Sequence, residues 1–358
     1  MKGKIRKLLA QADACPFGFA QADLVKEAVR LADVSQDKEL QFKTRVEYLS
    51  AACFSGRGKE MVVAYSWLLN HLDQYGAQEE KELLWPLKWV LGAVVSYSEF
   101  SASQVDYFFK DASNRYLDYR KSPRPLLILE ASYRIQQGRI DEAERLLKLA
   151  TRAKRDDYAD CVACEPTSLA GLYLLMGDAE KAVTLLEKSW SSGKTCGEEP
   201  ARGRVSGALA YSLCGKEKEA LACHQFGYPK ICRTDNMATF SWYSLAYKLR
   251  ANRLHDALSI LDRHIELFFK TMHKRHAFFF FKLGHQLMEK YRQKGRETLS
   301  LKSYRTLPGK VVVEDGVVSV SEFGKLLLNS ATTIGEAFDK RNESQRFKEL
   351  ISSNWPLD

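Results

Sequence analysis

Residues of the types that bind metal ions recur within one stretch of this sequence. Cys161 and Cys164 form a Cys-x2-Cys pair, Cys196 follows after 31 intervening residues, and His224 follows after 27 more. Three thiolates and one imidazole suit a tetrahedral zinc ion. We therefore expect Cys161, Cys164, Cys196 and His224 to form a structural zinc site that leaves no coordination position open for catalysis.

Two other interpretations of these residues stay open at this point. Cysteine is often a small apolar core residue, so the thiols and His224 would then simply pack inside the fold. Cys161 and Cys164 are also spaced as a redox pair, although the strand context of thioredoxin-like motifs is missing around them. A single Cys-x2-Cys pair is a weaker metal signal than two such pairs.

Helices must bring these residues together. Apolar residues recur at spacings of three and four from the first residues to about Tyr291, which predicts helices. Three blocks share one pattern, in which an alanine precedes a glycine by seven positions and another alanine follows it by five. The glycines are Gly138, Gly177 and Gly215, separated by 177 − 138 = 39 and 215 − 177 = 38 residues. Each block predicts a helical hairpin, because the glycine ends the first helix in a left-handed cap and the alanines let two helices approach closely.

Stacking of such hairpins would bring the four ligands to one rim. The first helices of adjacent hairpins lie side by side in a stack, so their starting ends are neighbours. Cys161 and Cys164 stand at the start of one first helix, and Cys196 stands just before the next. The second helix runs back antiparallel, which returns His224 toward the same end.

The hairpin pattern resembles the tetratricopeptide repeat. The second block carries the order of small, aromatic, glycine and alanine residues in Ala170, Tyr173, Gly177 and Ala182. The resemblance covers about residues 122 to 228, and a shorter fourth unit follows up to Leu261. It implies an all-α superhelix, a solenoid of stacked helical hairpins. The block from Asp160 to Glu165, with the later cysteine and histidine, is also similar to one found in bacterial repeat proteins of this kind.

The resemblance further implies a binding function. Stacked first helices create a concave groove that takes a protein or peptide ligand. The groove-facing positions would be Ser132, Gln136, Thr167, Arg202, Tyr243, Tyr247 and Lys248. A nucleic-acid-binding repeat protein and a peptide-sensing regulator are the alternatives.

The chain divides into three predicted parts. Residues 1–121 form N-terminal helical hairpins, 122–295 form the repeats, and 296–358 form a C-terminal hairpin and capping helix. In the first part we expect helices over Gln21–Ala32, Lys38–Phe54, Glu60–Gln74, Glu82–Tyr97 and Ala102–Arg120. In the last part, residues 311–318 predict a β-hairpin with an Asp-Gly turn, and one helix over Glu322–Ile351 caps the open end of the stack.

Composition narrows the classes of function. The 54 basic and 45 acidic residues leave a net charge of +9, but both signs alternate along most helices, which favours a solvated surface over a nucleic-acid face. No glycine-rich phosphate loop or nucleophile elbow is present, so we expect a binding protein and not an enzyme. The apolar stretches are shorter than the roughly 20 residues that span a bilayer. Eight cysteines without a secretory signal favour reduced thiols and a cytoplasmic location.

Overall fold

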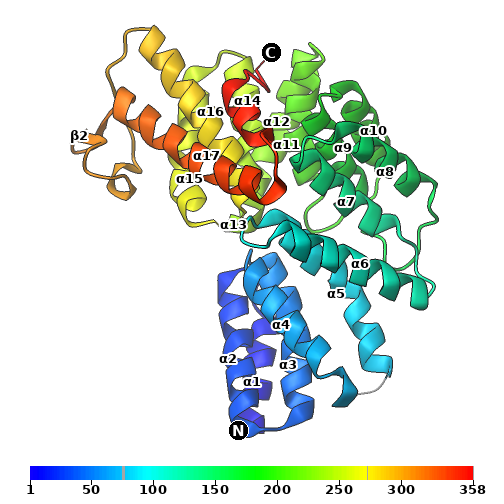
Figure 1. Ribbon diagram of the computed structural model, residues 1–358. Coiled ribbons are helices and arrows are strands. Elements are labelled where there is room, and N and C mark those ends of the chain that lie inside the picture. Colours follow the sequence, from blue (N-terminus) through cyan, green and yellow to red (C-terminus); the bar gives the residue numbers. More distant parts are fainter. Residues whose placement is uncertain (75–76, 272, 358) are drawn as a thin grey trace. The chain divides into compact units, whose positions relative to one another are not determined.

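The computed structural model describes residues 1–74, 77–271 and 273–357 and is helical along most of its length (Figure 1). The fold is an all-α helical repeat with a small antiparallel sheet near the C-terminus, as the sequence predicts. The chain forms two compact units, the first made of Met1–Glu130 with Glu144–Ala159 and the second of Ala131–Ala143 with Asp160–Asp358.

In the first unit each helix packs against the next one along the chain. The helix that begins at Lys2 was not expected as a separate element, and its apolar face buries Ile5 and Ala12. A short 3-10 helix, Leu72–Gln74, follows the fourth helix. The α-helices of this unit are α1 (Lys2–Asp13), α2 (Phe19–Ser35), α3 (Lys38–Phe54), α4 (Gly58–Asn70), α5 (Ala77–Ser96) and α6 (Ala102–Asp118).

The repeats follow as pairs of helices, which we call the first and second helices of each hairpin. The first helices are α7 (Arg124–Gln136), α9 (Cys164–Met176), α11 (Ala201–Leu213) and α14 (Ser241–Arg250). The second helices are α8 (Ile140–Arg152), α10 (Ala179–Ser191), α12 (Glu217–Ile231) and α15 (Leu254–Lys270), and a short α13 (Asp235–Ala238) precedes α14. Helix α9 packs on α11, and α11 packs on α14, so these first helices form one layer.

The turns between the paired helices confirm the glycine caps. Gly138, Gly177 and Gly215 have φ angles of 77°, 88° and 72°. At Gly177 the amide of Asp178 donates to the carbonyl of Tyr173 at 2.9 Å, which closes the last turn of α9 as a Schellman motif. Asn252, with φ 54°, takes the same place between α14 and α15. The pattern therefore extends to a fourth hairpin, where asparagine tolerates the left-handed conformation.

The C-terminal region adds a helix, a sheet and two more helices. Helix α16 (Lys274–Gln293) packs on α14, and α17 (Val320–Asn342) packs along α16. The sheet has the order β1-β3-β2, with β1 (Thr298–Ser300), β2 (Val312–Glu314) and β3 (Val317–Ser319). The predicted hairpin is present as β2 and β3, and β1 adds a third antiparallel strand.

The last predicted helix is interrupted. Helix α17 ends where Glu343 adopts a left-handed φ of 51°, and α18 (Arg346–Ser352) begins three residues later. The carboxylate of Asp339 accepts the amides of Phe347 and Lys348, both at 2.9 Å. These bonds satisfy the first amides of α18, so the chain turns back at this point and does not continue as one rod.

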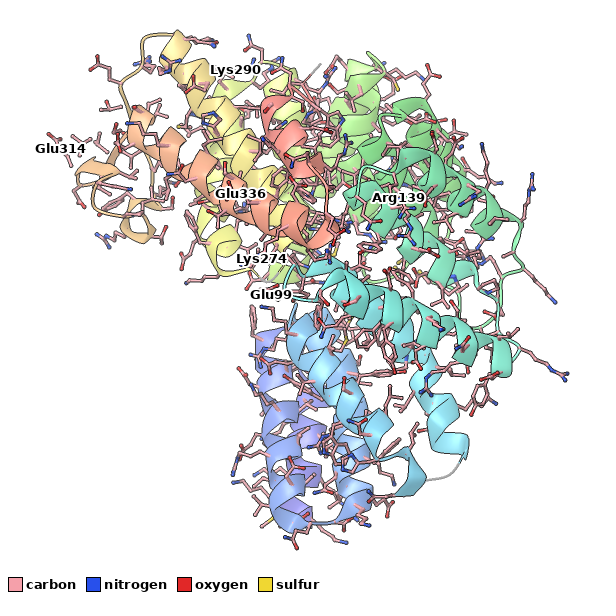
Figure 2. The ribbon with its side chains drawn as sticks, viewed as in Figure 1. Glu99, Arg139, Lys274, Lys290, Glu314 and Glu336 are labelled. Atoms are coloured by element: carbon pink, nitrogen blue, oxygen red, sulfur yellow. The ribbon has the colours of Figure 1, made fainter. Side chains whose placement is uncertain are left out.

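Charged side chains of both signs are spread over the exposed surface, with Arg139, Glu314 and Glu336 as examples (Figure 2). Within the described residues, none of the helices combines the length and apolar character that crossing a bilayer requires.

Candidate metal centre

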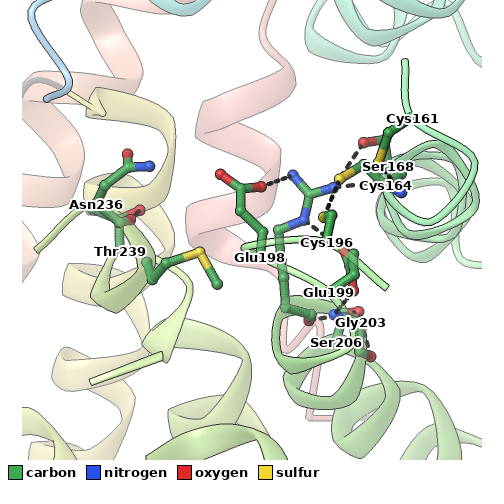
Figure 3. Close-up of polar contacts among 12 residues, drawn as sticks. Cys161, Cys164, Ser168, Cys196, Glu198, Glu199, Gly203, Ser206, Asn236 and Thr239 are labelled. Carbon is green, nitrogen blue, oxygen red and sulfur yellow. Dashed lines mark hydrogen bonds and ion pairs between the residues drawn. The ribbon is translucent and has the colours of Figure 1, made fainter. Parts of the chain in front are cut away.

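Three of the four predicted metal ligands meet at the starts of two consecutive first helices. Cys161 lies in the turn before α9, Cys164 is the first residue of α9, and Cys196 lies in the loop before α11. The three sulfur atoms all lie within 4.8 Å of one another, and the sulfurs of Cys164 and Cys196 are 3.2 Å apart (Figure 3). Because α9 and α11 pack together, their starting ends bring the two loops into contact.

A tight turn presents the first two thiols side by side. The carbonyl of Cys161 accepts the amides of Cys164 and Glu165, both at 3.1 Å. The amide of Cys164 also donates to the sulfur of Cys161 at 3.2 Å. An N–H that points at a sulfur stabilises its thiolate form, so the local backbone already favours a metal-binding charge state at Cys161.

The thiols differ in acidity although they lie together. Burial acts against the thiolate of Cys161, but hydrogen bonds from Cys164 and the Ala163 amide outweigh it and lower the pKa of Cys161. Burial raises the pKa of the Cys164 thiol, and the nearby Arg202 only partly offsets this effect. Three adjacent sulfurs cannot all ionise without a compensating cation. A metal ion is the group that would satisfy all three at once.

The spacing of the sulfurs fits zinc. With Zn–S bonds of about 2.3 Å, tetrahedral geometry separates two sulfurs by about 3.8 Å. The observed separations of 3.2 Å for one pair and at most 4.8 Å for all three bracket that value. In the part of the chain that the structure describes, no fourth histidine, cysteine or carboxylate belongs to this group. Cys161 and Cys196 are exposed, so solvent can reach the fourth position.

Arg202 ties the two loops together next to the thiols. Its guanidinium donates to Glu199 at 2.9 Å, pairs with Glu198 at 3.0 Å, and donates to the carbonyl of Cys164 at 3.1 Å (Figure 3). Glu199 is 5% exposed and also accepts the amide of Gly203 at 2.9 Å. Burial raises the pKa of Glu199, and Arg202 opposes this effect. The sequence placed Arg202 in a groove and did not indicate this bridging role.

The structure places His224 away from the three thiols. Its side chain is 8% exposed, and its Nδ1 lies 3.3 Å from the hydroxyl of Ser244. The rings of Tyr228 and Tyr247 lie 5.2 Å and 5.5 Å from the imidazole. His224 stands seven residues before Ile231, the last residue of α12, so the helical rise keeps it about 10 Å short of the loop end. It therefore packs between α12 and α14.

The predicted groove residues are mostly buried. Ser132, Gln136, Thr167, Tyr243, Tyr247 and Lys248 are each at most 8% exposed. Tyr247 packs near His224, and Lys248 pairs with Asp256 at 3.0 Å, so these two side chains face the second helices. The seven positions therefore do not line one open surface.

Two of these positions are covered by the C-terminal helices. The hydroxyl of Ser132 accepts a hydrogen bond from Arg275 at 2.8 Å. The side-chain oxygen of Gln136 accepts from Arg341, and its carbonyl accepts from Asn342, both at 3.1 Å. A ligand would reach this part of α7 only if these helices moved.

No family model matches this sequence, and no curated protein matches it either.

Proposed function

We propose that this protein is a non-catalytic helical-repeat scaffold that binds a protein or peptide, and that its thiols hold one structural zinc ion. The observation that carries the proposal is the convergence of Cys161, Cys164 and Cys196 at the starts of two consecutive first helices. The resemblance of the hairpins to the tetratricopeptide repeat supports the binding role, because stacked first helices of this kind take peptide ligands.

Bound zinc would act as a clip between repeats. Three thiolate bonds would join the loop before α9 to the loop before α11, and Arg202 already links the same loops through Glu198, Glu199 and the Cys164 carbonyl. The clip would hold neighbouring hairpins in register. All eight cysteines are free thiols, which is consistent with the reducing cytoplasm that we propose as the location.

The buried histidines support binding over catalysis. Burial lowers the pKa of His224 and of His264 to about 4. His224 lies beside Ser244, and the Nε2 atom of His264 lies 3.1 Å from the hydroxyl of Tyr228. Neutral histidines that bond to neighbouring helices act as packing groups, so we assign them a structural role.

The metal content of untagged protein tests the zinc clip. We expect about one zinc per chain by atomic emission in the wild type, and loss of that zinc in Cys161→Ser/Cys164→Ser. Cys15→Ser/Cys53→Ser is the matched control, because it also removes two free thiols, from the first unit, and it should keep the zinc. Metal-free wild-type protein in which mass spectrometry of unreduced peptides finds Cys164 joined to Cys196 would replace the clip with a redox pair.

Selection from a displayed random-peptide library tests the scaffold role. The full chain, immobilised through its amino terminus, should enrich a set of peptides that share a motif. Synthetic copies of these peptides should compete with one another for one saturable site. Failure of both the wild type and a variant with a released C-terminal segment to enrich any motif would contradict the proposal.

A further inference from the structure

The C-terminal segment, residues 346–357, lies against the first helices as a ligand would, and we call it the tail. It consists of α18 and the extended residues that follow. The ring centroid of Trp355 lies 5.5 Å from that of Phe279 on α16 and 6.5 Å from that of Trp242 on α14. Pro356, the next residue, is buried. The tail thus inserts an aromatic residue and a proline between two helices of the layer.

Two basic side chains hold the backbone of the tail. Arg250 donates to the carbonyl of Pro356 at 3.1 Å, and Lys282 donates to the carbonyl of Trp355. Arg250 ends α14, whereas Lys282 is 2% exposed in the middle of α16. Donors aimed at carbonyls recognise any extended chain, so these contacts do not require the sequence of this particular tail.

The start of the tail is held less closely. Arg346 donates to the carbonyl of Leu175 at 3.5 Å, at the end of α9. A cavity of about 210 Å³ separates Leu175, Met176 and Gly177 from the tail residues Leu350 and Trp355, among others. The packing between α9 and the tail is therefore incomplete, which leaves room for a differently shaped segment.

We propose that the tail is an internal ligand in a peptide site made by Trp242, Arg250, Phe279 and Lys282, and that a partner peptide containing an aromatic residue followed by proline displaces it. This inference rests on the proposed scaffold function and names the partner class and its competitor. A tethered segment competes at an effective concentration in the millimolar range. The partner therefore binds more weakly to the full chain than to a chain whose tail is released.

Trp355 is the residue to change, because its ring fills the site while Trp242 and Phe279 build it. The probe is a labelled peptide of residues 344–357 of this chain, and its affinity is measured by fluorescence anisotropy. We expect the full-length Trp355→Ala variant to bind the probe at least about tenfold more tightly than the wild type. A probe in which alanine replaces the tryptophan should not bind, and Trp355→Ala/Arg250→Gln should bind the original probe more weakly than Trp355→Ala.

Trp85→Ala is the matched control, because Trp85 is a partly exposed tryptophan of the first unit and its loss should leave probe affinity at the wild-type value. Far-UV circular dichroism shows whether each variant is folded. A folded Trp355→Ala variant that binds no more tightly than the wild type and Trp85→Ala would overturn the inference.

Hydrogen exchange on the wild type provides a test that needs no variant. Saturating unlabelled probe should speed exchange of the α18 amides, because it takes the place of the tail. Unchanged exchange at saturation would mean that the probe binds elsewhere and would also overturn the inference. The scaffold function fails separately, since it requires that no library peptide binds either the wild type or Trp355→Ala.

Discussion

The two ends of the hairpins in the second unit are closed by different kinds of interaction. At the turn end, Gly177 and its equivalents form hydrogen bonds between residues five positions apart, such as Asp178 and Tyr173. At the loop end, Cys164 meets Cys196 over 32 positions, and Arg202 reaches the Cys164 carbonyl over 38. The turn end thus shapes each hairpin by itself, whereas the loop end joins one hairpin to the next. Changes at the two ends should therefore differ in size and in what they disturb.

The largest effect is expected from metal removal at the loop end. A site that binds zinc only in the folded state adds about 4 kcal/mol to the free energy of unfolding when free zinc is 1,000-fold above its Kd. Urea unfolding of the wild type with and without a chelator should show this loss. Cys161→Ser/Cys164→Ser should be insensitive to the chelator, and an equal chelator effect in that variant would mean that the metal lies elsewhere.

His224→Gln tests whether the metal site extends beyond the loop end. The folded pKa of His224, about 4, lies below its ordinary value because of burial. The folded state therefore favours the neutral form, and this contribution to stability is present above about pH 6.5 and is lost as the pH falls toward 4. Between pH 7 and pH 5 the wild type should lose about 2 kcal/mol more stability than His224→Gln.

Zinc content separates the two roles of His224. A packing residue leaves the zinc content unchanged when glutamine replaces it, whereas a fourth ligand would not. His255→Gln is the control, because His255 is exposed in α15. Its pH profile should match that of the wild type in urea unfolding at both pH values.

Gly227→Ala should disturb the packing of α12 against the start of α11. A Cβ atom at this position would lie 2.9 Å from the carbonyl oxygen of Ala201 and 3.0 Å from a methyl carbon of Val205. The backbone oxygen cannot turn aside as a side chain can, so the helices must separate. We expect a loss of about 2 kcal/mol in the free energy of unfolding. A loss below that of a turn glycine would show that this contact is loose.

Gly177→Ala should have the smallest effect. A Cβ atom there meets nothing within 4 Å, so the cost is the left-handed backbone conformation alone, about 1 kcal/mol. Gly177→Asn should cost less, because Asn252 holds the same conformation in the fourth hairpin. Thermal or urea unfolding of the two variants gives the comparison, and equal losses would contradict the backbone explanation.

Features that depend on neighbours in the chain followed from the sequence. The glycine spacing located the hairpin turns, the Asp-Gly pair located the β-turn between β2 and β3, and the Cys-x2-Cys pair at a helix start placed two thiols together. Each depends on the conformation of a few consecutive residues, which side-chain type and φ preference govern. The interruption of the last helix was missed, because it depends on a carboxylate seven positions before α18 begins.

Contacts between distant residues were decided only by the tertiary structure. His224 and Cys196 seemed able to meet because antiparallel helices return to the same end, but the rise along α12 separates them. Gln136 seemed to face a groove, yet Arg341 covers it from 205 positions away. Likewise, Lys282 bonds to Trp355 across 73 positions. The sequence by itself therefore determined the helices, their turns and the paired thiols, whereas packing between helices decided which side chains stay free, since helix rotation and register place each one.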